Sequence, residues 1–392
     1  MTTKHSFLRG AVPFAIVAIV VGACTTGASA PPASQAAASQ PAASSGGGAS
    51  APASADPMAA LIDAAKTEGG LTTIALPHDW CNYGEALTTF TSKYGIPINE
   101  LNPDAGSGDE VEAIKANKDN KGPQAPDVID VGLSFGPQAK TDGLIAPYKV
   151  AGWADIPDTA KDPDGYWYGD YYGVLAFETN KAAVTNPPKD WADLLDGSHK
   201  NQIALAGDPR VSNQAIQTVY ASALANGGSL DNAQPGLDFF KKLNDAGNLV
   251  PTIAKPGTID QGATPITIRW TYNALAHRDK AAGNPEIDVT VPATGRFAGM
   301  YVQAISAFAP HPNAAKLWME FLYSNEGQNI WLKGYCNPIR FEAMSKANAI
   351  PADILAKLPD TAGAVFPTLD QLNKATELIT KNWDKVVGAD VK

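Results

Sequence analysis

The stretch YWYGDYYGVLAFETN, residues 166–180, decides the fold of this chain. Its first part is rich in aromatic side chains, and its second part is an apolar run that ends in polar residues. An apolar run of this length with such an end is typical of a buried strand. We expect this strand to leave a first α/β lobe and to lead into a second one.

Strands and helices alternate on both sides of this stretch. Short apolar runs predict strands, and segments with apolar residues at helical spacing predict helices between them. This alternation predicts a largely parallel sheet with helices on both faces and functional loops at the carboxyl ends of its strands. The loops of interest in the first lobe are residues 77–84, 104–108 and 132–137.

The N-terminus has the layout of a lipoprotein signal peptide. Basic residues precede an apolar run at 11–21 that is too short to span a bilayer, and VGAC at 21–24 ends this run with small residues and a cysteine. We expect residues 1–23 to be removed and Cys24 to carry the lipid. A signal peptide cut elsewhere, with Cys24 incidental, is the alternative.

Residues 24–56 predict a tether. Pro, Ala, Ser and Gly fill this segment, which has almost no large apolar side chain and cannot bury enough surface to offset the entropy of ordering. A flexible chain of this length reaches roughly 30 Å. We therefore expect a globular body held outside the cell membrane by its lipid.

The body, residues 57–392, is too long for one ordinary domain and suits two lobes. The chain has a formal net charge of −10, and this balance disfavours nucleic acid as a partner because binding would need a basic patch. The sequence shows no second apolar stretch long enough for a membrane span and no metal-type Cys/His cluster. We expect a monomer without metal or cofactor.

Two cysteines, Cys81 and Cys336, remain after the anchor. An even number of cysteines in an oxidising compartment predicts a disulfide, and both lie in aromatic-rich loop sequences. Two buried free thiols are the alternative.

Six segments follow one another along the body: AALIDAAKTEGGL, ALPHDWCNYGEALTTFTSKYGI, DVIDVG, YYGVLAFETN, WADLLDGSHKNQIALAGDPR and AAKLWMEFLYSNEGQNI. In this order they resemble the extracellular solute-binding proteins of ABC importers, in the branch that holds ferric-ion, thiamine and polyamine binders. The resemblance implies a type II periplasmic-binding-protein fold, in which two α/β lobes close on a ligand about a hinge and deliver it to a membrane permease. It also implies lobe 1 at 57–173, lobe 2 at 174–299 and a return to lobe 1 at 300–392, which brings Cys336 near Cys81.

The resemblance and the predicted strand ends together give a set of candidate ligand contacts. Aromatic residues dominate it, and their faces suit cations or flat rings, although core packing is the commoner fate of an aromatic residue. The candidates are Trp80, Asn82, Tyr83, Ser134, Phe135, Tyr172, Asp208, Arg210, Arg269, Trp270 and Tyr272.

The charge of the ligand stays open at this point. The aromatic residues and Asp208 favour a polyamine-like or heteroaromatic cation, whereas Arg210 and Arg269 suit a phosphonate, phosphate or carboxylate. Ferric binders of this family present two adjacent tyrosines, but this chain has Trp270-Thr271-Tyr272, which puts iron in doubt.

An enzyme is a further alternative. GLSFG at 132–136 matches a nucleophile elbow around Ser134, and three histidines lie downstream, but no oxyanion segment precedes it. A structural or adhesive lipoprotein would not need aromatic loops at strand ends. We expect a binding protein and no enzyme.

Overall fold

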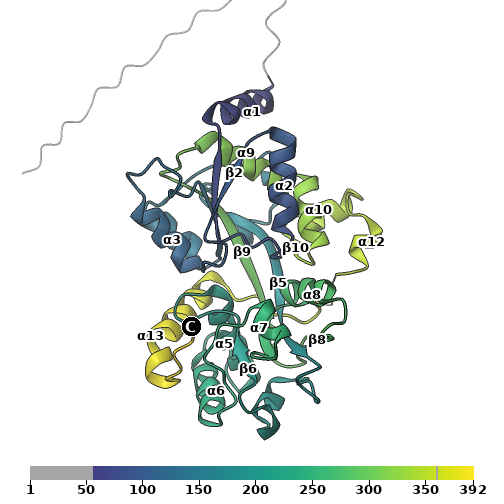
Figure 1. Ribbon diagram of the computed structural model, residues 1–392. Coiled ribbons are helices and arrows are strands. Elements are labelled where there is room, and N and C mark those ends of the chain that lie inside the picture. The colour runs from purple at the N-terminus through teal and green to yellow at the C-terminus, as the bar shows by residue number, and fades with distance from the viewer. Residues whose placement is uncertain (1–55, 359–360) are drawn as a thin grey trace, which may run out of the picture. The chain divides into compact units, whose positions relative to one another are not determined.

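The described part of the chain begins with three helices, each followed by a strand. A computed structural model describes residues 56–358 and 361–392 (Figure 1). The first two helices end at glycines in the left-handed region, Gly69 (φ 80°) and Gly95 (φ 70°), which favours glycine at these positions. The pairs are α1 (Pro57–Glu68) with β1 (Leu71–Ile74), α2 (Tyr83–Tyr94) with β2 (Ile98–Leu101), and α3 (Ser107–Ala116) with β3 (Val128–Gly132).

The stretch quoted first forms β5 (Tyr168–Asn180), which runs through both parts of the main sheet. The first half of β5 pairs antiparallel with β9 (Ala298–Ser306), and its second half pairs antiparallel with β7 (Ile266–Trp270) and β8 (Ile287–Thr290). The prediction that this strand passes from one set of strands to another is confirmed.

The expectation of a largely parallel sheet is wrong. Only β1 with β2, and β6 (Ile203–Leu205) with β7, pair in parallel among the strands of the described residues. The main sheet has the order β3-β9-β5-β7-β6. The two crossing strands, β5 and β9, run antiparallel to each other and to the other strands with which they pair, and the parallel pair β6–β7 makes the sheet mixed.

Two lobes are built around the two parts of this sheet (Figure 1). We call the elements around β1–β4 lobe 1 and those around β6–β8 lobe 2. Lobe 1 adds α4 (Phe135–Thr141), β4 (Ile145–Ala146), α9 (Pro312–Leu322), α10 (Asn325–Lys333), β10 (Asn337–Pro338), α11 (Phe341–Lys346) and α12 (Ala352–Leu355). Lobe 2 adds α5 (Asn213–Ala225), α6 (Gln234–Asp245), α7 (Pro256–Asp260) and α8 (Thr271–Ala281).

The C-terminal helix α13 (Leu369–Val386) differs from the expected return of residues 300–392 to lobe 1. After β9, α9 packs on α1 and α10 on α2 as expected, but α13 packs on α5 and α6 of lobe 2. Its apolar side recurs at helical spacing and is buried there, with the Trp383 and Phe240 rings 5.8 Å apart. The last helix therefore completes lobe 2.

The disulfide between Cys81 and Cys336 is present, with the two Cα atoms 5.5 Å apart. It joins the loop before α2 to the turn between α10 and β10. The loop that carries Trp80 is thus covalently fixed to the C-terminal part of lobe 1.

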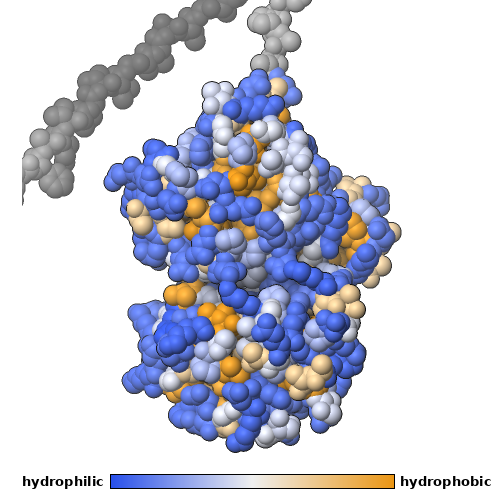
Figure 2. Space-filling model, in the orientation of Figure 1, coloured by the Kyte–Doolittle hydropathy of each residue, from blue (hydrophilic) through white to orange (hydrophobic). Residues whose placement is uncertain are grey.

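The surface in view is mainly hydrophilic (Figure 2). Large apolar side chains are exposed at Val211, Leu355, Val365 and Phe366. Within the part of the chain that the structure describes, no helix is both long and apolar enough to cross a bilayer. The predicted signal peptide and the lipidated Cys24 lie outside the described residues, as does the tether up to residue 55.

Candidate ligand-binding cleft

A cavity of about 220 Å³ lies between loops of lobe 1 and loops of lobe 2. Lobe 1 contributes parts of loops 77–84 and 104–108, two of the three loops that the sequence singled out. Lobe 2 contributes the segment after β6, the residues before α7, and Arg269 on β7. The third expected loop, residues 132–137, is absent from the lining of this cavity.

Two helices begin at the cavity. Gly106 and Ser107 start α3, and Ser212, Asn213 and Gln214 start α5; all five line the cavity. The first amides of a helix have no acceptor within the helix and carry the positive end of its dipole. These two helix starts therefore favour an anionic group between the lobes.

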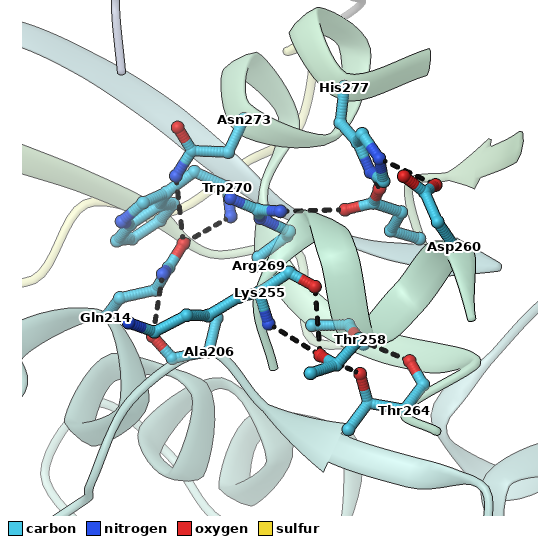
Figure 3. Close-up of polar contacts among 12 residues, drawn as sticks. Ala206, Gln214, Lys255, Thr258, Asp260, Thr264, Arg269, Trp270, Asn273 and His277 are labelled. Carbon is cyan, nitrogen blue, oxygen red and sulfur yellow. Dashed lines mark hydrogen bonds and ion pairs between the residues drawn. The ribbon is translucent and has the colours of Figure 1, made fainter. Parts of the chain in front are cut away.

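Arg269 adds a cation to the same cavity. It is 9 % exposed, and its Nη1 donates to Glu178 Oε2 at 3.2 Å. Its Nε has no hydrogen-bond partner within the described chain. Glu178 therefore holds one side of the guanidinium, and N–H groups remain for a ligand (Figure 3).

A buried network balances the charge behind Arg269. Glu178 is completely buried and also contacts His277 Nδ1, while His277 Nε2 lies 3.0 Å from Asp260 (Figure 3). Burial lowers the pKa of His277, but the hydrogen bond to Glu178 and the charges of Glu178 and Asp260 raise it above its ordinary value overall. Arg269 and His277 both contact Glu178, so the one carboxylate serves two partners.

Gln214 fixes the geometry of the lobe 2 wall. Its Oε1 accepts the Trp270 amide at 2.8 Å and the Asn273 side chain at 3.4 Å, and its Nε2 donates to the Ala206 carbonyl at 3.3 Å (Figure 3). The start of α5, the end of β7 and the loop after β6 are thus joined by one side chain.

Carboxyl groups lie on the lobe 1 side of the cavity. Asp130 on β3 accepts hydrogen bonds from Tyr83 at 2.8 Å and Tyr171 at 2.7 Å, and its carboxyl also faces that of Asp170. Burial raises the pKa of Asp130 to about 6, and burial together with the charge of Asp130 raises the pKa of Asp170 well above its usual range. Two buried carboxyls that interact in this way lose their protons as a pair rather than independently.

The structure brings three of the eleven predicted contacts to the cavity, namely Trp80, Asp208 and Arg269. Three more, Tyr83, Trp270 and Tyr272, are completely buried behind its wall, where the Trp80 and Tyr272 rings meet edge to face at 5.5 Å and the Trp270 and Tyr272 rings stack at 6.2 Å. Five lie outside the lining of this cavity: Asn82, Ser134, Phe135, Tyr172 and Arg210.

Asp208 is engaged by Arg210. Both of its carboxylate oxygens accept from Arg210 Nε, at 2.8 and 2.9 Å. Arg210 also pairs with Asp384 at the end of α13 and with Asp390 beyond it. Arg210 therefore binds the C-terminal segment to lobe 2, and Asp208 holds the Arg210 side chain in place.

Ser134 lies just before α4 and is 8 % exposed. Within the described chain no hydrogen bond joins it to a histidine. The three downstream histidines have other partners: His199 contacts Gln202, His277 contacts Glu178 and Asp260, and His311 contacts Asp127.

The sequence analysis missed most of the polar lining of the cavity. The missed groups include Asn213 and Gln214 on α5, Glu110 on α3, and Tyr301 on β9. Ser107 lies in the loop 104–108 that the sequence singled out, but it was not among the candidate ligand contacts. In the structure its hydroxyl accepts the Gly132 amide at 3.1 Å and it lines the cavity. The signal in the sequence that could have indicated these residues was a predicted helix that starts soon after a predicted strand.

Comparison with known sequences finds one family model that matches most of the body. Residues 124–365 match the model described as bacterial extracellular solute-binding protein. A Salmonella typhimurium protein named "Putative 2-aminoethylphosphonate-binding periplasmic protein" is 25% identical over 260 residues, which cover 64% of this chain and 72% of that protein. A Sinorhizobium fredii protein named "Probable ABC transporter periplasmic-binding protein y4fP" is 24% identical over 300 residues, covering 72% of this chain and 79% of that protein.

Comparison with solved structures identifies the fold. The periplasmic binding protein AfuA from Actinobacillus pleuropneumoniae, solved with fructose-6-phosphate bound, superposes with a TM-score of 0.64 at 21% sequence identity. The match covers 81% of this chain and 98% of AfuA. The two α/β lobes described above thus form a type II periplasmic-binding-protein fold.

Proposed function

This chain belongs to the family of bacterial extracellular solute-binding proteins, and we propose that its cleft captures a small solute through an anionic group such as a phosphonate, phosphate or carboxylate. Proteins of this kind in ABC importers bind a small molecule and deliver it to a membrane permease. The anionic ligand, which the sequence analysis held as an alternative, is now the first choice.

One observation carries this proposal: donors from both lobes converge on one cavity. The starts of α3 and α5 bring backbone amides, and Arg269 brings a guanidinium whose Nε lacks a partner in the described residues. Asn213 Nδ2 is a further buried donor without a hydrogen-bond partner there. Buried donors without partners are costly, so a ligand that supplies acceptor oxygens would satisfy them.

The features that favoured a cation are weaker in the structure. The rings of Tyr83, Trp270 and Tyr272 are completely buried and pack on other rings, so no face of theirs is open to a ligand. Asp208 already holds Arg210. The named role of the Salmonella typhimurium relative, a phosphonate binder, agrees with an anionic ligand.

Arg269→Gln should weaken binding of a phosphonate or phosphate by at least about tenfold, because hydrogen bonds to charged groups contribute roughly 1.5–3 kcal/mol. Isothermal titration calorimetry with inorganic phosphate, ethylphosphonate and spermidine would measure this. Arg278→Gln is the matched control, since Arg278 pairs with Asp279 on α8 outside the cavity. Anion binding that is equal in wild type and Arg269→Gln, or binding of spermidine alone, would contradict the proposal.

We also propose that Cys24 anchors the protein by a lipid and that residues 24–56 are its tether. The support is the sequence pattern of the N-terminus. The protein should partition into the detergent phase of a phase-separation assay, and Cys24→Ala should move it to the aqueous phase or leave an uncut precursor. Wild-type protein found only in the aqueous phase would exclude the anchor.

A further inference from the structure

The α3 wall of the cavity holds an acid that the anion-binding groups do not use. Glu110 lines the cavity and is 1 % exposed. Its Oε2 accepts the backbone amide of Asp130 at 3.0 Å. Its other oxygen takes part in no hydrogen bond among residues 56–358 and 361–392. Glu110 therefore has one carboxyl oxygen at the cavity that can still accept a hydrogen bond.

Among the residues that the structure describes, acids surround Glu110 and no unpaired cation lines the cavity. Asp130 on β3 and Asp109 on the same helix both act on it, and the hydroxyl of Tyr301 on β9 lies near it. Burial, and then the charge of Asp130, raise the pKa of Glu110 well above its usual range. The two cations that line the cavity, Lys255 and Arg269, are paired with Asp104 and Glu178. A cationic group of the ligand would therefore be the partner for Glu110 that the described residues do not provide.

The other acids of the cavity wall are already engaged. Asp79 is the exception, but it is exposed at the mouth rather than buried. The partners are Tyr83 and Tyr171 for Asp130, Arg210 for Asp208, Lys255 for Asp104, and the Gly106 amide for Asp109. Asp130 Oδ1 also has no hydrogen-bond partner in the described residues, so Asp130 and Glu110 are the two buried acids of the wall with an oxygen open to a ligand. Asp130 already accepts from two tyrosine hydroxyls and Glu110 from one backbone amide, so Glu110 is the less engaged of the two.

We propose that Glu110 binds an ammonium group of the ligand, so that the cleft selects a solute with an anionic group at one end and a protonated amine at the other, as in an aminoalkylphosphonate. The inference rests on the proposed anion site at the helix starts and Arg269. Glu110 belongs to lobe 1 and Arg269 to lobe 2. A zwitterion held by Glu110 at one end and by Arg269 at the other contacts both lobes at once and so stabilises the closed state.

The test compares two ligands that share the anion and differ in the amine. Calorimetric titration with 2-aminoethylphosphonate and ethylphosphonate should give at least tenfold tighter binding of the amine-bearing ligand to the wild type. In Glu110→Gln this ratio should fall below about threefold, with ethylphosphonate bound no worse than before. The control is Glu112→Gln on the same helix, an exposed acid paired with Lys115, which should keep the full ratio.

The outcomes separate this inference from the function on which it rests. Equal binding of both ligands to the wild type would overturn the role of Glu110 and leave the anion site intact. No binding of either ligand would overturn the anion site and this inference with it. A ratio that survives Glu110→Gln but is lost in Asp79→Asn would place the amine at the mouth and overturn the inference. If Glu110→Gln does not fold, Glu110→Asp, which withdraws the acid by one methylene, should lose most of the ratio.

Discussion

Gly132→Ala should weaken solute binding about a hundredfold and leave each lobe folded. A Cβ atom at Gly132 would lie 2.0 Å from Asn213 Cγ, well inside van der Waals contact. The Asn213 side chain has little room to move, because it is buried and its Oδ1 accepts from Gln217 at 2.8 Å. Gly132 ends β3 in lobe 1 and Asn213 begins α5 in lobe 2, so the clash falls between the lobes. Incomplete closure keeps the α5 amides from the ligand.

The measurement is the affinity for whichever anion binds the wild type, together with thermal unfolding to verify the fold. Gly197→Ala is the matched control, because Gly197 has no left-handed φ and a Cβ there meets nothing within 4 Å. Adding Asn213→Ala to Gly132→Ala removes the clashing atoms and should recover part of the affinity. If Gly132→Ala binds the anion with wild-type affinity, binding does not require Gly132 and Asn213 to approach each other as closely as they do in this structure, and the prediction is wrong.

The path of the chain could be predicted from local patterns. The apolar run at 166–180 marks the crossing strand, and glycines mark the ends of α1 and α2. The sequence did not reveal the sense of strand pairing, because an apolar run is equally compatible with parallel and antiparallel neighbours. The lobe on which α13 packs could not be predicted either, because its apolar side could pack on either lobe. The ion pairs that join this segment to Arg210 also span about 180 residues, which no local pattern reveals.

The site was predicted less well because it depends on side-chain direction. Arg269 and Trp270 are neighbours on β7, and successive side chains of a strand point to opposite faces. Arg269 therefore lines the cavity, while Trp270 is buried on the other side. Judged by residue type alone, Arg269 and Trp270 were both candidate ligand contacts. The backbone amides at the starts of α3 and α5 have no residue type to identify them, and only the three-dimensional arrangement brings them together.

Removing the Cys81–Cys336 disulfide should lower the free energy of unfolding by about 5 kcal/mol in the chain-entropy model. The reason is its span, since the bond joins residues 255 positions apart. A second, local effect concerns ligand binding. Cys81, Asn82 and Tyr335 have positive φ angles of 47°, 62° and 66°, a region that residues other than glycine disfavour. Without the bond, the loop can relax and Trp80, next to Cys81, can leave the cavity wall, so ligand affinity should also fall.

Urea unfolding of the native protein, the reduced protein and Cys81→Ala/Cys336→Ala would measure the loss. The double variant is needed because it has neither thiol. The bond is therefore absent without a reductant and cannot re-form during the measurement. Both bond-free forms should unfold at a lower urea concentration by the same amount, since the effect resides in the unfolded chain. Thiol titration of the unfolded, unreduced protein should find neither cysteine free. An unfolding midpoint unchanged by reduction would mean that the reduced chain keeps these loops together by packing alone.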